Sequence, residues 1–80
     1  MGAQFAEPFV KLADYLDWAH SVGCNIRTGF AATGSGTIYL TVVTAPSGRY
    51  VVIHDVDEDE ALPASAYAYY DRRLGLKSPF

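Results

Sequence analysis

The stretch that decides the fold is TIYLTVVT at residues 37–44, followed closely by RYVVIH at residues 49–54. β-Branched and aromatic side chains dominate both stretches, and such side chains favour extended backbone. The four residues between them, APSG at 45–48, include the proline, serine and glycine that are typical of a tight turn. The pattern predicts two neighbouring antiparallel strands joined by a short loop.

A third strand is expected before these two. From Cys24 onward, Ile26, Thr28 and Phe30 alternate with polar or small residues, which is the period-two pattern of a strand. Residues 32–36 (ATGSG) then indicate a turn. Three strands joined by two short turns predict an antiparallel meander.

Helical periodicity is found before the strands. Pro8 suits a first helical turn, Glu7 suits the positive end of a helix dipole, and Gly23 is a natural stop, so we expect a helix over about 7–22. Apolar spacing of three and four residues gives its expected inward face: Phe9, Leu12, Ala13, Leu16, Ala19 and His20.

A second helix is expected from Pro63 through Leu74, ended by Gly75 with Leu76 folding back on the last turn. Its expected inward face is Ala66, Tyr67, Tyr70 and Leu74. The predicted fold class is α+β with the order αβββα: a three-stranded antiparallel sheet with two helices packed on one face. All 80 residues are expected to form a single domain, 1–80.

The composition is that of a small intracellular protein. Half of the residues are hydrophobic, which is enough for a packed core, and the one cysteine, Cys24, is expected to be a small buried residue. No apolar run approaches the roughly 20 residues that cross a bilayer, and the N-terminal residues lack the pattern of a secretory signal. We therefore expect a cytoplasmic protein that does not contact membranes.

The charge balance disfavours direct binding of nucleic acid. The formal net charge is −3, with six basic and nine acidic residues, whereas nucleic-acid binding usually requires a basic face. Arg72, Arg73 and Lys77 form one local basic cluster. An acidic cluster consists of Asp55, Asp57, Glu58, Asp59 and Glu60. Such a cluster repels phosphate and attracts a basic protein surface.

Several short motifs follow one another in the order of a known family. They are GS at 34–35 with IY at 38–39, GRYVVI at 48–53, LP at 62–63 and GL at 75–76. Over roughly Val10 to Leu76 the chain resembles the HicA family of toxin–antitoxin systems. Those proteins are small mRNA interferases with an αβββα fold related to double-stranded RNA-binding domains, and the resemblance implies this fold.

The chain departs from the family where catalysis would occur. The catalytic histidine of the family would fall at Gly36, with Thr37 beside it, and neither residue titrates near neutral pH. The family's basic loop before the last helix is here the acidic stretch 55–60, and the segment 39–48 is longer than usual. We therefore carry over the fold and not the catalysis, and expect no catalytic residue.

Other candidate chemistry is weaker. His54 and the adjacent acidic cluster are residues of types that can bind a metal ion. The stretch 54–60 lacks the glycine and the spacing of a calcium-binding loop, so we expect no metal and no cofactor. His54 could also serve as a displaced base, and His20 could pair with Asp17 or lie at the core boundary. Both histidines are more simply explained as partly buried structural residues.

Tyrosines are the remaining candidates for an interface. Successive helical residues diverge by about 100°, so Tyr67, Tyr69 and Tyr70 cannot all face the core. We expect some of the rings of Tyr39, Tyr50, Tyr69 and Trp18 to be exposed. Exposed aromatic rings serve protein interfaces and also stack on nucleic-acid bases, and the acidic balance favours a protein partner.

The sequence therefore predicts a small non-enzymatic inhibitor that binds a basic nucleic-acid-binding protein. A Cas effector subunit in a bacterial host cell is one such partner, since phages and prophages use small acidic proteins as anti-CRISPR inhibitors. The expected contact residues are Asp55, Asp57, Glu58, Asp59, Glu60, Tyr39, Tyr50 and Tyr69. The expected state is a monomer or weak dimer. The alternatives are a divergent HicA-type RNA-binding protein or mRNA interferase, and an antitoxin or immunity protein.

Overall fold

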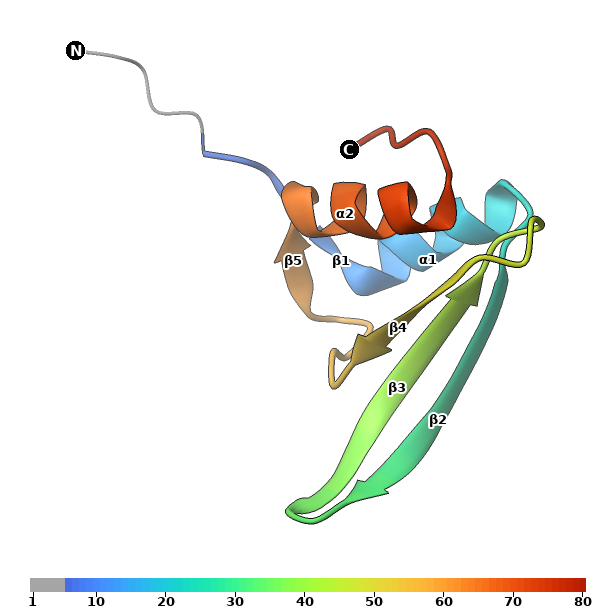
Figure 1. Ribbon diagram of the computed structural model, residues 1–80. Helices are drawn as coiled ribbons and strands as arrows, with labels where there is room; N and C mark the ends of the chain where they lie inside the picture. The colour runs from blue at the N-terminus through green and yellow to red at the C-terminus, as the bar shows by residue number, and fades with distance from the viewer. Residues whose placement is uncertain (1–5) are drawn as a thin grey trace.

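The computed structural model describes residues 6–80, and its fold is α+β (Figure 1). Residues 1–5 of the expected domain lie outside the described part. The elements in order are β1 (Phe9–Lys11), α1 (Leu12–Ser21), β2 (Asn25–Thr33), β3 (Gly36–Thr44), β4 (Tyr50–His54), β5 (Ala61–Pro63) and α2 (Ala64–Leu74). The class, the two helices and the three-stranded antiparallel sheet β2-β3-β4 confirm the prediction, and the two-stranded sheet β1-β5 was not predicted.

The hairpin of β2 and β3 extends well beyond the rest of the sheet. Its register runs from Asn25↔Thr44 to Thr33↔Gly36, whereas β4 pairs only with residues 40–44 of β3. Figure 1 shows the distal half of the hairpin projecting as a two-stranded arm. The turn is shorter than predicted, because the strands reach Thr33 and resume at Gly36, whose φ of 135° favours glycine.

Helix α1 begins at Leu12, so the predicted start near residue 7 is wrong. Residues 9–11 instead form β1 and pair with β5. The backbone N–H groups of Leu12 and Ala13 donate to the carbonyl oxygens of Glu60 and Glu58, each at 2.9 Å. The acidic loop therefore caps α1 with its backbone and satisfies N–H groups that a helix leaves open.

Glu7 lies at the other helix. Its Oε1 accepts a hydrogen bond from the backbone N–H of Ser65 at 2.8 Å, in the first turn of α2. This bond holds the pKa of the Glu7 carboxyl below its usual value. The expected position of Glu7 at the start of the first helix is thus corrected, since the β1–β5 pair brings the chain before α1 to the start of α2.

Both helices share one core with one face of the sheet. On β3 and β4, the buried side chains of Thr41, Val43, Val51 and Ile53 alternate with the half-exposed ones. The hydrophobic core consists of Leu12, Tyr15, Leu16, Ala19, Cys24, Val43, Ala45, Val51, Ile53, Tyr67 and Leu74. The burial of Cys24 confirms its prediction as a small buried residue.

The inward faces of the helices differ from the predicted ones. Phe9 is 67% exposed and His20 is exposed, because Phe9 belongs to β1 and His20 lies beside the buried row of α1. Tyr15, which was not predicted to be buried, is fully buried and stacks on Tyr67 with ring centroids 4.5 Å apart. In α2 the buried residues are Ala64, Tyr67, Asp71 and Leu74, whereas Ala66 and Tyr70 are half-buried.

Helix α2 ends as predicted. Gly75 has left-handed backbone with φ 73°, its N–H donates to the Arg72 carbonyl at 3.2 Å, and the Leu76 N–H donates to the Asp71 carbonyl at 2.8 Å. This pair of bonds is the Schellman motif, in which carbonyl groups at the helix end are satisfied by residues just after it.

Candidate functional site

Strand β4 has an open edge. Hydrogen bonds to β3 and its loop flank the strand at both ends. Before β4, the Arg49 carbonyl accepts from the Ala45 N–H at 2.8 Å; after β4, the Asp55 N–H donates to the Tyr39 carbonyl at 2.6 Å. Because bonding alternates along an antiparallel strand, the odd-numbered residues from 49 to 55 face β3. The N–H and C=O groups of the even-numbered residues, Tyr50, Val52 and His54, point to the other side. Within residues 6–80 they have no backbone partner outside the strand.

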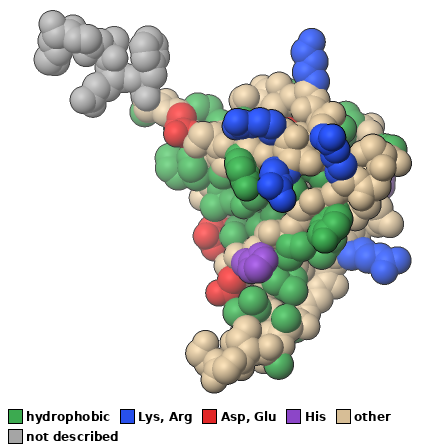
Figure 2. Space-filling model, viewed as in Figure 1, with side chains coloured by type: hydrophobic (Ala, Val, Ile, Leu, Met, Phe, Trp, Pro, Cys, Tyr) green, Lys and Arg blue, Asp and Glu red, His purple; other side chains and the backbone are tan. Residues whose placement is uncertain are grey.

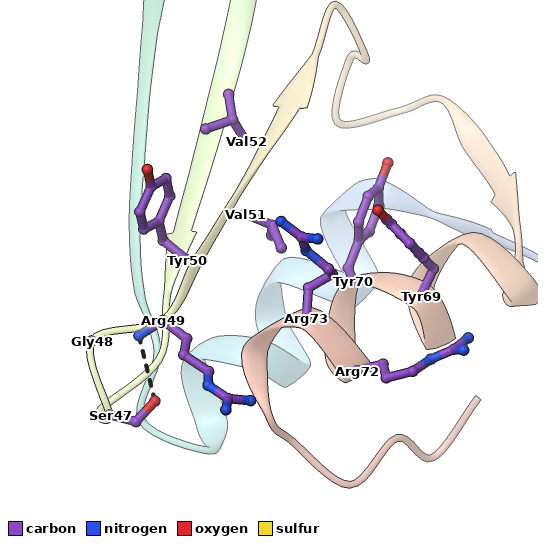
Figure 3. Close-up of a pocket in the computed structure, with 10 residues that line it drawn as sticks. All are labelled: Ser47, Gly48, Arg49, Tyr50, Val51, Val52, Tyr69, Tyr70, Arg72 and Arg73. Atoms are coloured by element: carbon purple, nitrogen blue, oxygen red, sulfur yellow. Dashed lines mark hydrogen bonds between the residues drawn. The ribbon is translucent and has the colours of Figure 1, made fainter.

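A groove lies between this region of β4 and helix α2 (Figure 3). It is lined by residues 47–52 and by Tyr69, Tyr70, Arg72 and Arg73. Its volume is about 860 Å³, within the range of roughly 300–1,000 Å³ that is common for small-ligand sites. The β3–β4 loop and β4 form one wall, and the last turns of α2 form the other.

The groove is positively charged. Arg49, Arg72 and Arg73 are three of the six basic residues of the chain, and no Asp or Glu lies among the lining residues. Within residues 6–80 none of these arginines forms a side-chain hydrogen bond or an ion pair. Figure 2 shows Lys and Arg side chains gathered over α2 and the nearby end of the sheet, with Asp and Glu at another margin of this face.

Helix α2 helps to gather the arginines. Arg72 and Arg73 lie in its last turn, where the negative end of the helix dipole favours cations. The guanidinium of Arg49 reaches the same end from the β3–β4 loop, since its Nη1 lies 2.9 Å from the point where a Cβ on Gly75 would stand. A side chain at residue 75 would therefore displace Arg49.

Tyrosines supply apolar surface beside these charges. Tyr50 is 62% exposed and Tyr69 is 51% exposed, while Tyr70 is half-buried and contacts Tyr69 with ring centroids 6.0 Å apart. In Figure 3, Tyr69 and Tyr70 rise from α2, and Arg73 reaches from α2 toward Val51 of β4. Burial raises the pKa of the Tyr70 hydroxyl above its ordinary value.

The structure places the predicted interface residues in three regions. Tyr50 and Tyr69 lie in the basic groove, and Tyr39 lies on the arm, where its ring contacts Phe30 at 5.4 Å between centroids. The acidic residues lie in the loop between β4 and β5. All of them are exposed: Asp55, Asp57, Glu58, Asp59 and Glu60. Asp55 alone joins Tyr39, whose N–H donates to its Oδ1 at 3.5 Å.

Arg49, Arg72, Arg73 and Tyr70 were not among the predicted site residues. Arg72 and Arg73 belong to the basic cluster of the sequence, whereas Arg49 lies at the start of the predicted strand over residues 49–54, more than 20 residues before them. Placing Arg49 beside the end of α2 requires the packing of α2 against β4. The feature of the sequence that could have indicated this site is the presence of arginines both at a turn and at a helix end, because packing of the helix can bring these two places together.

The positions considered for catalysis and metal binding are scattered. Gly36, where the histidine of the HicA family would fall, is exposed at the tip of the arm, and His54 is exposed at the end of β4. Within residues 6–80 no three His, Cys, Asp or Glu side chains are placed to hold a metal ion. Neither helix in this part of the chain has the length and apolar character needed to cross a membrane.

Comparison of the chain with models of protein families, with curated proteins and with solved structures found no match.

Proposed function

We propose that this protein is a non-enzymatic binding protein that holds an acidic segment of another protein in the groove between β4 and α2. The single observation that carries this proposal is the set of three arginines that have no side-chain partner within residues 6–80 and lie beside exposed tyrosines. Binding there would act by occupying the partner's surface.

The chemistry of arginine supports an acidic partner. A guanidinium offers a planar fork of N–H donors that matches a carboxylate, and charge-assisted bonds of this kind are among the stronger ones. Tyrosine and arginine are also the residues that most often dominate binding energy in protein interfaces. The groove combines both types on β4, the β3–β4 loop and α2.

The overall charge favours a short acidic segment over a long polyanion. The nine acidic residues of the chain give it a net charge of −3, and eight of them are exposed outside the groove, where an extended nucleic acid would approach them. Fields between exposed charges fade over about 10 Å at 0.1 M salt, so the arginines act mainly inside the groove. A peptide of a few residues fits this local field.

The test uses a fluorescein-labelled decaglutamate peptide and fluorescence anisotropy. We expect binding that weakens as salt rises, and at least a tenfold loss of affinity in the double variant Arg72→Glu/Arg73→Glu. The matched control is Lys11→Glu/Arg27→Glu, which changes the net charge equally at residues that do not line the groove. Equal losses in the two double variants, or no binding by the peptide, would contradict the proposal.

A second candidate function uses the acidic loop. All five of its acidic side chains are exposed, and within residues 6–80 none forms an ion pair. This favours the inhibitor predicted from the sequence, which binds a basic nucleic-acid-binding protein such as a Cas effector. Protection of a phage from CRISPR immunity by the expressed chain, lost on Asp57→Lys/Glu58→Lys/Asp59→Lys, would support it. If the variant still protects the phage, the acidic loop is not the surface that binds the partner.

The scaffold itself is proposed to be of the HicA type. The order of a helix, three antiparallel strands and a helix supports this, with β1 and β5 as additions. A divergent HicA-type RNA-binding protein predicts RNA binding or growth arrest on expression, and RNA cleavage lost on His54→Ala would support the interferase. Absence of all of these activities would retire this alternative.

A further inference from the structure

We infer that the acidic segment binds as an added β-strand along the open edge of β4, extending the sheet β2-β3-β4 by one strand. This inference rests on the proposed function, because it concerns the same groove. It specifies the conformation of the partner and the groups that recognise its backbone.

The backbone of β4 provides the recognition. Tyr50, Val52 and His54 direct their N–H and C=O groups away from β3, and neither helix bonds to them. Residues two apart on a strand are separated by roughly 6.5–7 Å, which is the spacing at which an antiparallel neighbour exchanges its bonds. An extended peptide can therefore pair with this edge in the way that β-augmentation complexes do.

The side chains define which peptide fits. Side chains of an added strand alternate between the two faces of the sheet. On the face of Val51, they would meet Arg73 and Tyr70 of α2, as the arrangement in Figure 3 indicates. On the other face, the side chains of the added strand would lie beside the exposed Tyr50 and the half-exposed Val52. The expected partner segment alternates acidic residues with apolar ones.

The same charges argue against a second copy of this chain as the occupant. The strand β4 of a second copy, Tyr50–His54, contains no acidic side chain that could pair with Arg72 or Arg73. An acidic segment therefore complements the groove better than edge-to-edge dimerisation, which open strand edges otherwise invite.

The experiment uses a labelled peptide of five Glu-Val repeats and an identical peptide whose alternate backbone nitrogens are methylated. Methylation removes the donors needed for strand pairing and keeps every charge. We expect the unmodified peptide to bind one copy of the chain, and methylation to reduce its affinity at least tenfold. Amide hydrogen exchange of Tyr50, Val52 and His54 should slow at least tenfold when the unmodified peptide binds.

A protein variant provides an independent arm. In Val52→Pro the lost N–H faces the groove and not β3, so the ladder within the sheet keeps its bonds, and proline is tolerated on strand edges of this kind. We expect this variant to retain cooperative unfolding and to lose at least tenfold in affinity for the Glu-Val peptide. The methylated peptide keeps the inference testable if the variant does not fold.

The outcomes separate the inference from the proposed function. One outcome would overturn strand addition and leave the acidic-segment proposal standing. In it, binding depends on the arginines, the methylated and unmodified peptides bind with equal affinity, and amide hydrogen exchange in β4 does not change. Failure of both acidic peptides to bind would overturn both. A ten-nucleotide oligouridylate that displaces the peptide in an arginine-dependent manner would overturn both in favour of nucleic acid, and dimerisation through β4 would overturn the choice of partner.

Discussion

Asp71 is a carboxylic acid in the interior of a small domain. Its side chain is fully buried, its Oδ1 accepts a hydrogen bond from the Tyr15 hydroxyl at 2.7 Å, and its Oδ2 has no partner within residues 6–80. A buried polar group is costly unless it is bonded, so this one bond matters more than an exposed bond would. Burial first, and the bond to Asp71 next, raise the pKa of the Tyr15 hydroxyl well above its ordinary value.

The buried tyrosines predict that the free energy of unfolding decreases at alkaline pH. Unfolded tyrosine ionises near pH 10, whereas folded Tyr15, Tyr67 and Tyr70 all have raised pKa values. Above pH 10 the unfolded state therefore binds fewer protons than the folded state, and the free energy of unfolding falls as pH rises. Urea unfolding between pH 8 and pH 11.5 measures this slope, which should be less steep in Tyr15→Phe. An unchanged slope in that variant would contradict the role of Tyr15.

Tyr15→Phe should also lower stability at neutral pH. It removes the hydroxyl that donates to the Asp71 carboxyl, which has no other hydrogen-bond partner within residues 6–80, and an unsatisfied buried group costs about 1–3 kcal/mol. The control is Tyr39→Phe, whose hydroxyl forms no hydrogen bond within residues 6–80. Urea midpoints of the two variants should differ accordingly, and equal midpoints would show that the Asp71 bond contributes little.

At the scale of elements, Gly75 joins the end of α2 to the groove. It has left-handed backbone, and a Cβ placed on it would stand 2.9 Å from Nη1 of Arg49. One glycine thus completes the helix cap and makes room for an arginine of the candidate site.

Gly75→Ala should therefore affect both stability and binding. Left-handed backbone costs a non-glycine residue roughly 1–2 kcal/mol, and the methyl group forces Arg49 to move. We expect a lower unfolding midpoint together with weaker binding of the decaglutamate peptide. Gly36→Ala is the matched control, because Gly36 also has positive φ but a Cβ there would meet nothing within 4 Å. Comparable loss of peptide binding in the control would contradict the link to Arg49.

At the scale of the molecule, charge and shape are divided among three regions. The basic groove lies between α2 and β4, the acidic loop caps α1, and the β2–β3 arm projects from the sheet. No residue of 29–39 belongs to the hydrophobic core, and Phe30 on the arm is 76% exposed. Folding of the core should therefore depend little on the end of the arm.

Replacing residues 32–37 with Asn-Gly tests this division. Ala31 and Ile38 are register partners whose backbone groups face each other, and Asn-Gly is the preferred two-residue turn between such a pair. We expect cooperative unfolding to persist and peptide affinity to stay within twofold of the original value. Loss of cooperative unfolding, seen by circular dichroism, would show that the arm is part of the folding unit.

Local patterns in the chain were enough to predict the fold class, the three antiparallel strands, the end of α2 and the burial of Cys24. They suffice because period-two alternation, turn residues and the glycine cap act between near neighbours in sequence. The β1–β5 pair was not predictable in this way, since three-residue strands carry almost no pattern and their partners are about 50 residues apart.

The candidate site depended on tertiary structure for the same reason. Arg49 and Arg72 line one groove only because α2 packs beside β4, and one edge of β4 is open because β4 is the last strand of the sheet β2-β3-β4. The hydrogen-bond partner of the buried Asp71 carboxyl is likewise a hydroxyl 56 residues away on α1. Side-chain type and spacing determine local conformation, whereas the place where distant charges converge is decided by how the elements pack.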